Sequence, residues 1–155
     1  VVVIIPLLKK SIFKIKNNEI LIVAKPKGIS VERYKTHFVI PFFERAHLIN
    51  LDPIKFDLSS KNNSKDIKIS VAIDHNDKNN LGKFIKWIFQ KQIPSRKNKK
   101  IIKHHCSLII NNIFNNIISN LKEDNNINKE LIITKLFATL ENPLINIGFK
   151  IIEIK

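Results

Sequence analysis

Residues 67–92 read IKISVAIDHNDKNNLGKFIKWIFQKQ, and the spacing of the apolar residues changes in the middle of this stretch. In residues 67–73 every second residue is apolar, which is the period of a strand with one buried face. After a polar segment, four apolar residues recur at the spacing of an amphipathic helix: Leu81, Phe84, Ile85 and Ile88. This change predicts that strands precede about residue 75 and that helices follow it.

The part before this change is predicted to form short strands. Residues 12–16 (IFKIK) and 19–25 (EILIVAK) are apolar runs separated by an Asn-Asn pair that is typical of a turn. Residues 54–58 (IKFDL) alternate between apolar and polar side chains. The segment that follows, residues 59–66 (SSKNNSKD), has the composition of a loop.

The part after the change is predicted to contain three helices and a closing strand. The basic segment 94–100 (PSRKNKK) is expected to be an exposed linker to a long helix from about Lys99 to Leu121. The predicted apolar stripe of that helix comprises Ile102, Cys106, Ile109, Ile113, Ile117 and Leu121.

A third helix is predicted for about Lys129–Glu141, with Asn142-Pro143 at its end, and residues 145–155 are expected to include a strand. On its buried side this helix carries Ile132, Leu136 and Leu140. The order of these elements along the chain, with strands first, then helices and a final strand, favours an α+β fold. We expect a mixed, mostly antiparallel sheet with helices packed on it.

The composition indicates a folded, strongly basic protein. The chain has 155 residues, of which 44% are hydrophobic, enough for one core or two small cores. It contains 27 Lys and Arg against 13 Asp and Glu, a net charge of +14. Such a surplus attracts nucleic acid or acidic lipid headgroups. The abundance of Lys, Asn and Ile is also what an AT-rich coding sequence produces, so part of the charge has a purely compositional explanation.

The first ten residues, VVVIIPLLKK, allow two interpretations. The apolar run is far shorter than the ~20 residues that span a bilayer. It is either a first strand or the trailing end of a membrane anchor, whose cytoplasmic flank would carry Lys9 and Lys10. Because methionine is absent, position 1 included, we expect the chain to be part of a longer protein. The single cysteine, Cys106, excludes an internal disulfide.

The sequence contains no recognisable catalytic motif. Its three glycines cannot form a P-loop or a dinucleotide-binding fingerprint. The cluster His104-His105-Cys106 has metal-ligand types, but consecutive helical residues point about 100° apart and cannot close on one ion. We therefore expect no enzyme activity, no metal and no cofactor.

Nucleic-acid binding is the alternative that the charge suggests. Residues 94–105 (PSRKNKKIIKHH) form a basic patch at a helix start, and Trp87 or Tyr34 could stack on bases. The aromatic residues are not interleaved with the lysines, and no recognition motif is present. A soluble basic nucleic-acid-binding domain is thus the second hypothesis.

Residues 37–51, HFVIPFFERAHLINL, begin like a strand and break at Pro41. Proline cannot donate a hydrogen bond to a sheet, so it fits an edge or a loop. Phe42 and Phe43 are then either displayed on that loop or packed into the core, where large aromatic residues usually lie.

In the order of these features, residues 12–155 resemble the band 7 family, also called the SPFH domain, of stomatins, prohibitins and flotillins. The resemblance rests on IFKIKNNEILIV (12–23), HFVIPFFERAHLINLDPIKFDLS (37–59), DIKISVAI (66–73) and NKELIITKLFATLENPLINIGFKIIEIK (128–155). Flotillin-like members are the most similar. The sequence departs from relatives in its asparagine-rich IINNIFNNIISN (109–120), where they often carry an arginine.

The resemblance implies a non-enzymatic, membrane-associated scaffold that oligomerises and organises lipid patches or membrane protein complexes. The implied partners are membrane lipids, further copies in the full-length protein, and membrane proteins or a membrane protease; nucleic acid is not among them. The domain would lie on the cytoplasmic side of the cell membrane. Implied lipid contacts are Val1, Val2, Val3, Ile4, Ile5, Leu7, Leu8, Phe42 and Phe43, with Lys9 and Lys10 at anionic headgroups.

This reading divides the chain into three parts. Residues 1–10 are the end of an anchor or a first strand, 11–60 a strand-rich membrane-proximal subdomain, and 61–155 an α/β subdomain with the long helix and the closing strand.

Overall fold

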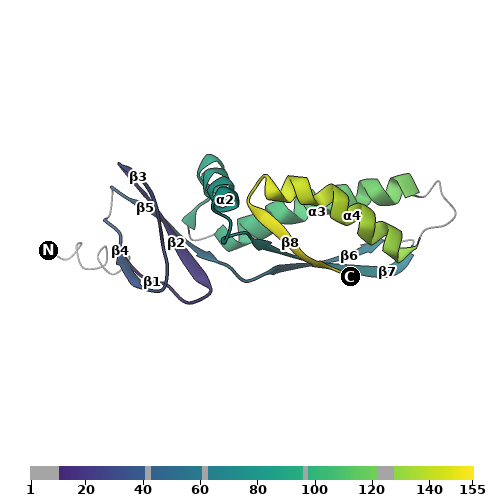
Figure 1. The fold of residues 1–155 in the computed structure, drawn as a ribbon, viewed down its shortest axis with the longest axis horizontal. Helices are drawn as coiled ribbons and strands as arrows, with labels where there is room; N and C mark the ends of the chain where they lie inside the picture. Colours follow the sequence, from purple (N-terminus) through teal and green to yellow (C-terminus); the bar gives the residue numbers. More distant parts are fainter. Residues whose placement is uncertain (1–10, 41–42, 61–62, 96–97, 122–127) are drawn as a thin grey trace. The chain divides into compact units, whose positions relative to one another are not determined.

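A computed structural model describes residues 11–40, 43–60, 63–95, 98–121 and 128–155, and it confirms the α+β class. In these ranges the chain forms β1 (Ile12–Lys14), β2 (Glu19–Lys25), β3 (Gly28–Glu32), β4 (Thr36–Phe38), β5 (Arg45–Asn50), β6 (Ile54–Ser60), β7 (Asn63–Ile73), α2 (Lys78–Gln90), α3 (Asn98–Leu121), α4 (Lys129–Ile145) and β8 (Phe149–Ile154) (Figure 1).

The chain forms two compact units. The first comprises the described residues up to Asp52 together with Gln92–Lys99, and the second comprises Pro53–Lys91 and Lys100–Lys155. The expected boundary between residues 60 and 61 falls between β6 and β7, which pair in one sheet of the second unit. In the structure the division precedes β6, because strand pairing ties β6 to the residues that follow it.

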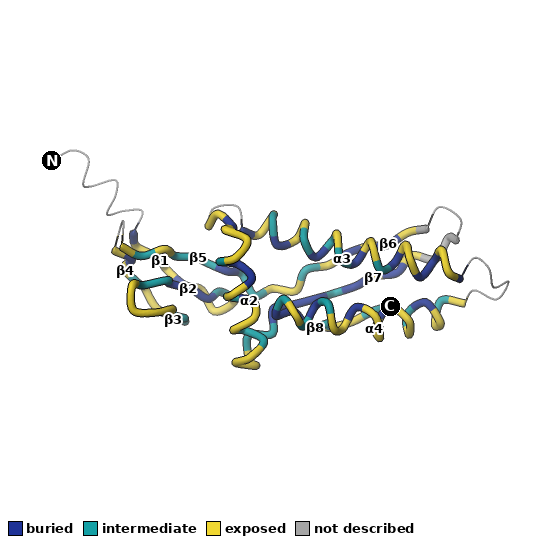
Figure 2. The backbone as a smooth tube through the Cα atoms, turned by 90° about the horizontal axis from the view of Figure 1, so that it is seen from above, coloured by how far each residue is buried: buried dark blue, intermediate teal, exposed yellow. Residues whose placement is uncertain are grey.

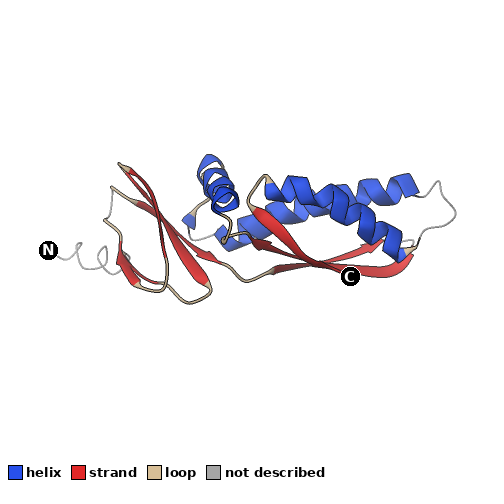
Figure 3. Cartoon of the chain, in the orientation of Figure 1, coloured by secondary structure: helices blue, strands red, loops and turns tan. Residues whose placement is uncertain are grey.

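Up to Asp52, every regular element that the structure describes in the first unit is a strand, and these strands form two antiparallel sheets (Figure 3). One sheet has the order β3-β2-β5, and the other is a two-stranded ribbon of β1 and β4. The predicted turn at Asn17 and Asn18 does join β1 to β2. These two strands nevertheless belong to different sheets, since β1 pairs with β4 from farther along the chain.

Strand β2 is central because both of its faces are buried. Ile20 and Ile22 are 0% exposed on one face, and Leu21 and Val23 are 0% exposed on the other. A continuous apolar run, and not an alternating one, is the pattern of such a strand. The core of the unit gathers Ile15, Leu21, Val23 and Val39, with Phe13, Ala46 and Leu48 packed against them.

The second unit is an antiparallel sheet, β6-β7-β8, with helices over one face (Figure 1). On β7 the buried side chains Ile67, Ile69 and Val71 alternate with Lys68 and Ser70, as the sequence predicts. Seen from above, α3 and α4 lie side by side over the sheet, with β7 between them (Figure 2). The helices therefore cover the apolar face and leave the polar face open.

Aromatic packing joins α2 to β8. The ring of Phe84 lies 5.6 Å from that of Phe149 and 6.0 Å from that of Trp87, between ring centroids. The rings of Trp87 and His105 are nearly perpendicular, with their centroids 5.5 Å apart, and Trp87 is only 8% exposed. Trp87 is therefore a core residue of the second unit and is not presented to solvent as a base-stacking surface.

Two predicted boundaries are wrong. Residues 59–66 were expected to be a loop, yet β6 extends to Ser60 and β7 starts at Asn63, apart from residues 61–62, which lie outside the described residues. Backbone pairing continues there although the side chains are polar, because ladder hydrogen bonds do not require apolar residues. Helix α4 likewise continues beyond Asn142 to Ile145. Pro143 removes one backbone donor, but burial of Leu144, 0% exposed, stabilises the last turn.

The apolar stripe of α3 is also displaced from the predicted one. Ile102, Cys106, Ile117 and Leu121 are buried as expected, whereas Ile109 and Ile113 are only half-buried. Ile110 and Phe114 take the innermost positions, at 0% and 4% exposed. Ile113 instead lines a groove towards α4. The position of α4 decides which side of α3 is fully buried, and the apolar pattern of α3 alone does not predict that position.

Candidate functional site

The two-stranded ribbon of β1 and β4 displays apolar side chains on its outer side. Ile12 and Phe38 are direct register partners, and they are 51% and 48% exposed. The intervening side chains turn inwards: Phe13 packs against the core, and Val39 is 6% exposed. This alternation follows from strand geometry, in which successive side chains point to opposite faces.

The ribbon continues past the ends of the two strands. The amide of Val39 donates to the carbonyl of Ser11 at 2.8 Å, and the amide of Ile15 donates to the carbonyl of Lys35 at 3.2 Å. Ile40, two residues after Phe38, is 49% exposed. It therefore extends the apolar outer side towards the next turn.

Phe43 lies on that turn and is exposed to solvent. The amide of Ile40 donates to the Glu44 carboxylate at 2.9 Å, and the amide of Glu44 donates back to the carbonyl of Ile40 at 3.1 Å. These reciprocal bonds close the turn, and Phe43 is 71% exposed. Of the two alternatives for this aromatic pair, display on the loop holds for Phe43. Pro41 and Phe42 lie outside the described residues.

We call Ile12, Phe38 and Ile40, together with the exposed Phe43 on the adjoining turn, the apolar ribbon face. The opposite end of the ribbon is polar: Lys14 pairs with Thr36, and both side chains are exposed. Lys16 and Lys35 are exposed as well, and Lys35 makes an ion pair of 2.8 Å with Glu32. The outer side of the ribbon thus changes from apolar to basic over the length of two short strands.

Of the lipid contacts expected from the sequence, the structure describes Phe43. Phe42 and the terminal residues Val1, Val2, Val3, Ile4, Ile5, Leu7, Leu8, Lys9 and Lys10 all lie outside the described residues. Sequence reasoning missed Ile12, Phe38 and Ile40. The alternation of these residues with Phe13 and Val39 can be seen in the sequence. Which of the two sides of each strand faces solvent, however, depends on the pairing of β1 with β4.

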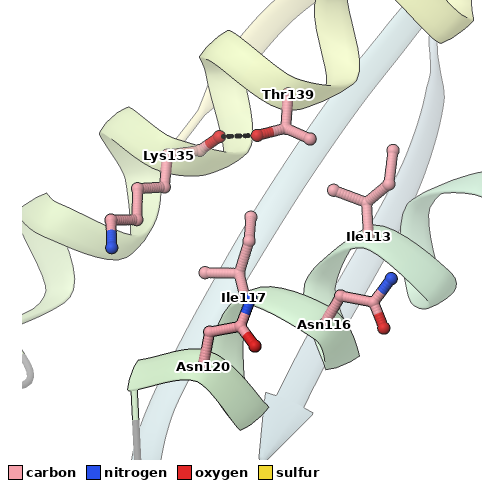
Figure 4. A pocket seen from close by; sticks show the side chains of 6 residues that line it. All are labelled: Ile113, Asn116, Ile117, Asn120, Lys135 and Thr139. Atoms are coloured by element: carbon pink, nitrogen blue, oxygen red, sulfur yellow. Dashed lines mark hydrogen bonds between the residues drawn. The ribbon is translucent and has the colours of Figure 1, made fainter. Parts of the chain in front are cut away.

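A groove separates α3 from α4 (Figure 4). Its volume is about 260 Å³, and it is lined by Ile113, Asn116, Ile117, Asn120, Lys135 and Thr139. The Thr139 hydroxyl donates to the carbonyl of Lys135 at 2.7 Å, so it is already satisfied within its own helix. The remaining polar lining consists of amides and one ammonium group, which is not the composition of a nucleophilic or acid–base centre.

The histidine–cysteine cluster is spread around α3. His104 is exposed, the ring of His105 packs against Trp87, and Cys106 is 0% exposed. Burial raises the pKa of the Cys106 thiol to about 12, so this side chain stays protonated at neutral pH. Among the described residues, no three His, Cys, Asp or Glu side chains gather to hold a metal ion.

His47 is a buried titratable group in the first unit. It lies on β5 opposite Ile22 and is 7% exposed. Burial lowers the pKa of His47 from its usual 6.5, and the charge of Arg45 lowers it further. The unfolded chain therefore binds a proton on this residue at a higher pH than the folded chain does.

We expect the free energy of unfolding to fall as the pH drops below about 6.5 and to be insensitive to His47 above it. Urea unfolding at pH 7.5 and at pH 5 measures the effect, and His47→Gln should flatten it. Asp52 and Asp74 do not interfere, because hydrogen bonds from asparagine side chains hold their pKa values below the usual 3.8. An equal pH dependence in the variant would contradict the assignment.

None of the described helices combines the length and the apolar character that crossing a bilayer requires. The sequence matches no protein-family model, and no curated protein matches it either.

Proposed function

We propose that this chain is the membrane-facing domain of a non-enzymatic scaffold of the band 7 type, with flotillin-like members most similar. The observation that carries the proposal is the apolar ribbon face. The order of strands and helices in residues 12–155, which resembles that family, supports it. In this role the domain lies on the cytoplasmic side of a cell membrane. The full-length protein then self-assembles and organises lipid patches or membrane protein complexes.

The geometry of the ribbon suits a shallow insertion into a bilayer. Side chains two residues apart on one strand face are separated by about 6.6–6.8 Å. An interfacial element buries its apolar face about 5–10 Å deep, at the boundary of headgroups and acyl chains. With Ile12 and Phe38 at that depth, Lys14 reaches the headgroups. Each lysine near an anionic surface contributes about 1 kcal/mol of attraction.

Two weak signals are needed because neither suffices alone. A small apolar contact gives marginal, reversible binding, and a basic surface alone is screened by salt. The chain has both: the four exposed side chains of the apolar ribbon face and a net charge of +14. The nucleic-acid hypothesis loses one of its two stacking residues, because Trp87 is buried; only Tyr34, 64% exposed, remains.

Vesicle flotation tests the proposal. We expect the chain to bind vesicles that contain phosphatidylserine more tightly than pure phosphatidylcholine vesicles, and the difference should shrink as salt rises. Phe43→Ser should weaken binding to both vesicle types while leaving the thermal unfolding temperature unchanged, because the ring is exposed. Equal binding to both vesicle types would remove the electrostatic part of the proposal. A salt-dependent affinity for single-stranded RNA without lipid binding would favour the alternative.

A further inference from the structure

Among the described residues, neither the backbone conformation nor the packing requires one of the three glycines to be a glycine. Gly28 and Gly148 have φ values of +140° and +80°, which residues with a side chain rarely adopt. Gly82 instead lies inside α2, and a Cβ added there would meet nothing within 4 Å. An exposed glycine within a helix costs about 0.5–1 kcal/mol relative to alanine. Because Gly82 has no side chain, another group can come close to the helix backbone at this position.

The surroundings of Gly82 are basic. Lys78 and Lys86 lie one helical turn before and after it, and Lys83 is adjacent. All three lysines are exposed, and none makes an ion pair among the described residues. Around Gly82 the exposed side of α2 therefore lacks a side chain, and the backbone positions of Lys78 and Lys86 lie about 6 Å along the helix on either side of it. It suits an apolar group flanked by carboxylates.

The outer side of α4 has that composition. Glu130, Thr134, Phe137 and Glu141 recur at helical spacing, and all four are exposed. Phe137 is 48% exposed, while Lys135 and Thr139 line the groove towards α3 and so lie on another side of the helix. In a chain of net charge +14, this is an acidic surface with an exposed aromatic ring at its centre.

We propose that the outer side of α4 in one copy docks on α2 of a second copy. Phe137 packs on the backbone at Gly82, and Glu141, one turn from Phe137, pairs with Lys78 or Lys86. The proposal extends the self-assembly of the proposed scaffold and requires no lipid.

Charge complementarity selects a second copy as the occupant. Two copies of a chain with net charge +14 repel each other over most of their surfaces. The acidic side of α4 meeting the basic side of α2 replaces that repulsion by attraction. Because the contact joins two different surfaces, it can repeat from copy to copy. It is small, so we expect weak association in solution that strengthens at low salt.

Disulfide trapping tests the contact in lipid-free solution. Chains carrying Gly82→Cys are mixed with chains carrying Phe137→Cys under mild oxidation. The native Cys106 does not interfere, because it is 0% exposed. We expect mixed dimers in several-fold excess over either homodimer and over a control mixture of Gly82→Cys with Lys68→Cys, an exposed position on the open sheet face. Mixed dimers no more abundant than in the control would overturn the proposal, as would a predominance of Gly82→Cys homodimers.

A charge reversal separates a specific contact from random collision. Glu141→Lys in the Phe137→Cys chain should lower the yield of mixed dimers several-fold. Lys78→Glu with Lys86→Glu in the Gly82→Cys chain should restore it. The proposal would also be overturned if Glu141→Lys left the yield of mixed dimers unchanged, or if the compensating lysine-to-glutamate changes did not restore that yield. If mixed dimers are trapped but the chain does not bind vesicles, the contact between copies is supported and only the membrane role is rejected.

Discussion

Replacing Ile12 and Phe38 together by serine is expected to lower the binding of the chain to phosphatidylserine vesicles by roughly 30-fold. An isoleucine or phenylalanine side chain contributes about 1.5–3 kcal/mol when it is fully removed from water. Half of each side chain is exposed on the apolar ribbon face, so the pair offers roughly 2 kcal/mol to a lipid contact. A factor of ten in affinity corresponds to about 1.4 kcal/mol.

The matched control is Ile29→Ser. Ile29 is 52% exposed, nearly the same fraction as Ile12, but it lies on β3 in the other sheet of the first unit. Loss of a comparable exposed isoleucine there should leave vesicle binding unchanged. If Ile29→Ser weakened binding as much as the double variant, general surface hydrophobicity would explain the result, and the ribbon would have no special role. Circular dichroism should show both variants folded.

Gly148→Ala is expected to destabilise the second unit by about 3 kcal/mol or more. With φ at +80°, an alanine incurs backbone strain of about 1–3 kcal/mol. The added Cβ would also lie 2.5 Å from Cβ of Phe84 and 2.7 Å from its backbone nitrogen, and it would collide with the carbonyl of Asn80. Overpacking of this kind costs a further 1–3 kcal/mol, roughly.

The neighbours of Gly148 have little freedom to move away. Phe84 is 0% exposed within the aromatic packing, and Asn80 donates to Asp74 at 2.9 Å. Asp74 is held in turn by an ion pair of 3.0 Å with Lys150 and by its amide, which donates to the carbonyl of Gly148 at 2.9 Å. Relief of the clash would therefore break several of the interactions that hold α2, Asp74 and β8 together.

Urea unfolding measures the effect, with Gly82→Ala as the control. Gly82 lies in the same unit, but its position is helical and open, so alanine should raise the free energy of unfolding by about 0.5–1 kcal/mol. We therefore expect Gly148→Ala to lower the free energy of unfolding and Gly82→Ala to raise it. A Gly148→Ala variant as stable as the original chain would show that the turn before β8 adopts another conformation.

Much of the fold could be predicted from local patterns. The alternation in residues 67–73 identified part of β7, and the run 19–25 identified β2 to the residue. The helical spacing from Leu81 identified α2, and the start of α4 at Lys129 and the end of α3 at Leu121 were also correct. These features rest on side-chain periodicity and on turn residues, which act over a few positions of the chain.

The candidate site is a different case. The sequence pointed to the Pro-Phe turn, and Phe43 is exposed there, but Ile12 and Phe38 become one surface only when β1 pairs with β4. That pairing joins residues more than twenty positions apart. Local patterns do not specify such a partner, because it is chosen by the packing of the whole unit.

The sequence by itself determined the helices, several of the strands, the basic charge and the strand-then-helix order, because each depends on composition or on neighbouring residues. The tertiary structure alone decided which apolar residues stay in solvent. Trp87 and Phe38 are both aromatic residues flanked by polar and apolar neighbours, yet one is 8% and the other 48% exposed. The difference arises because Phe149 and His105 cover Trp87 from other elements, whereas in its short ribbon Phe38 has Ile12, itself half exposed, as its strand partner.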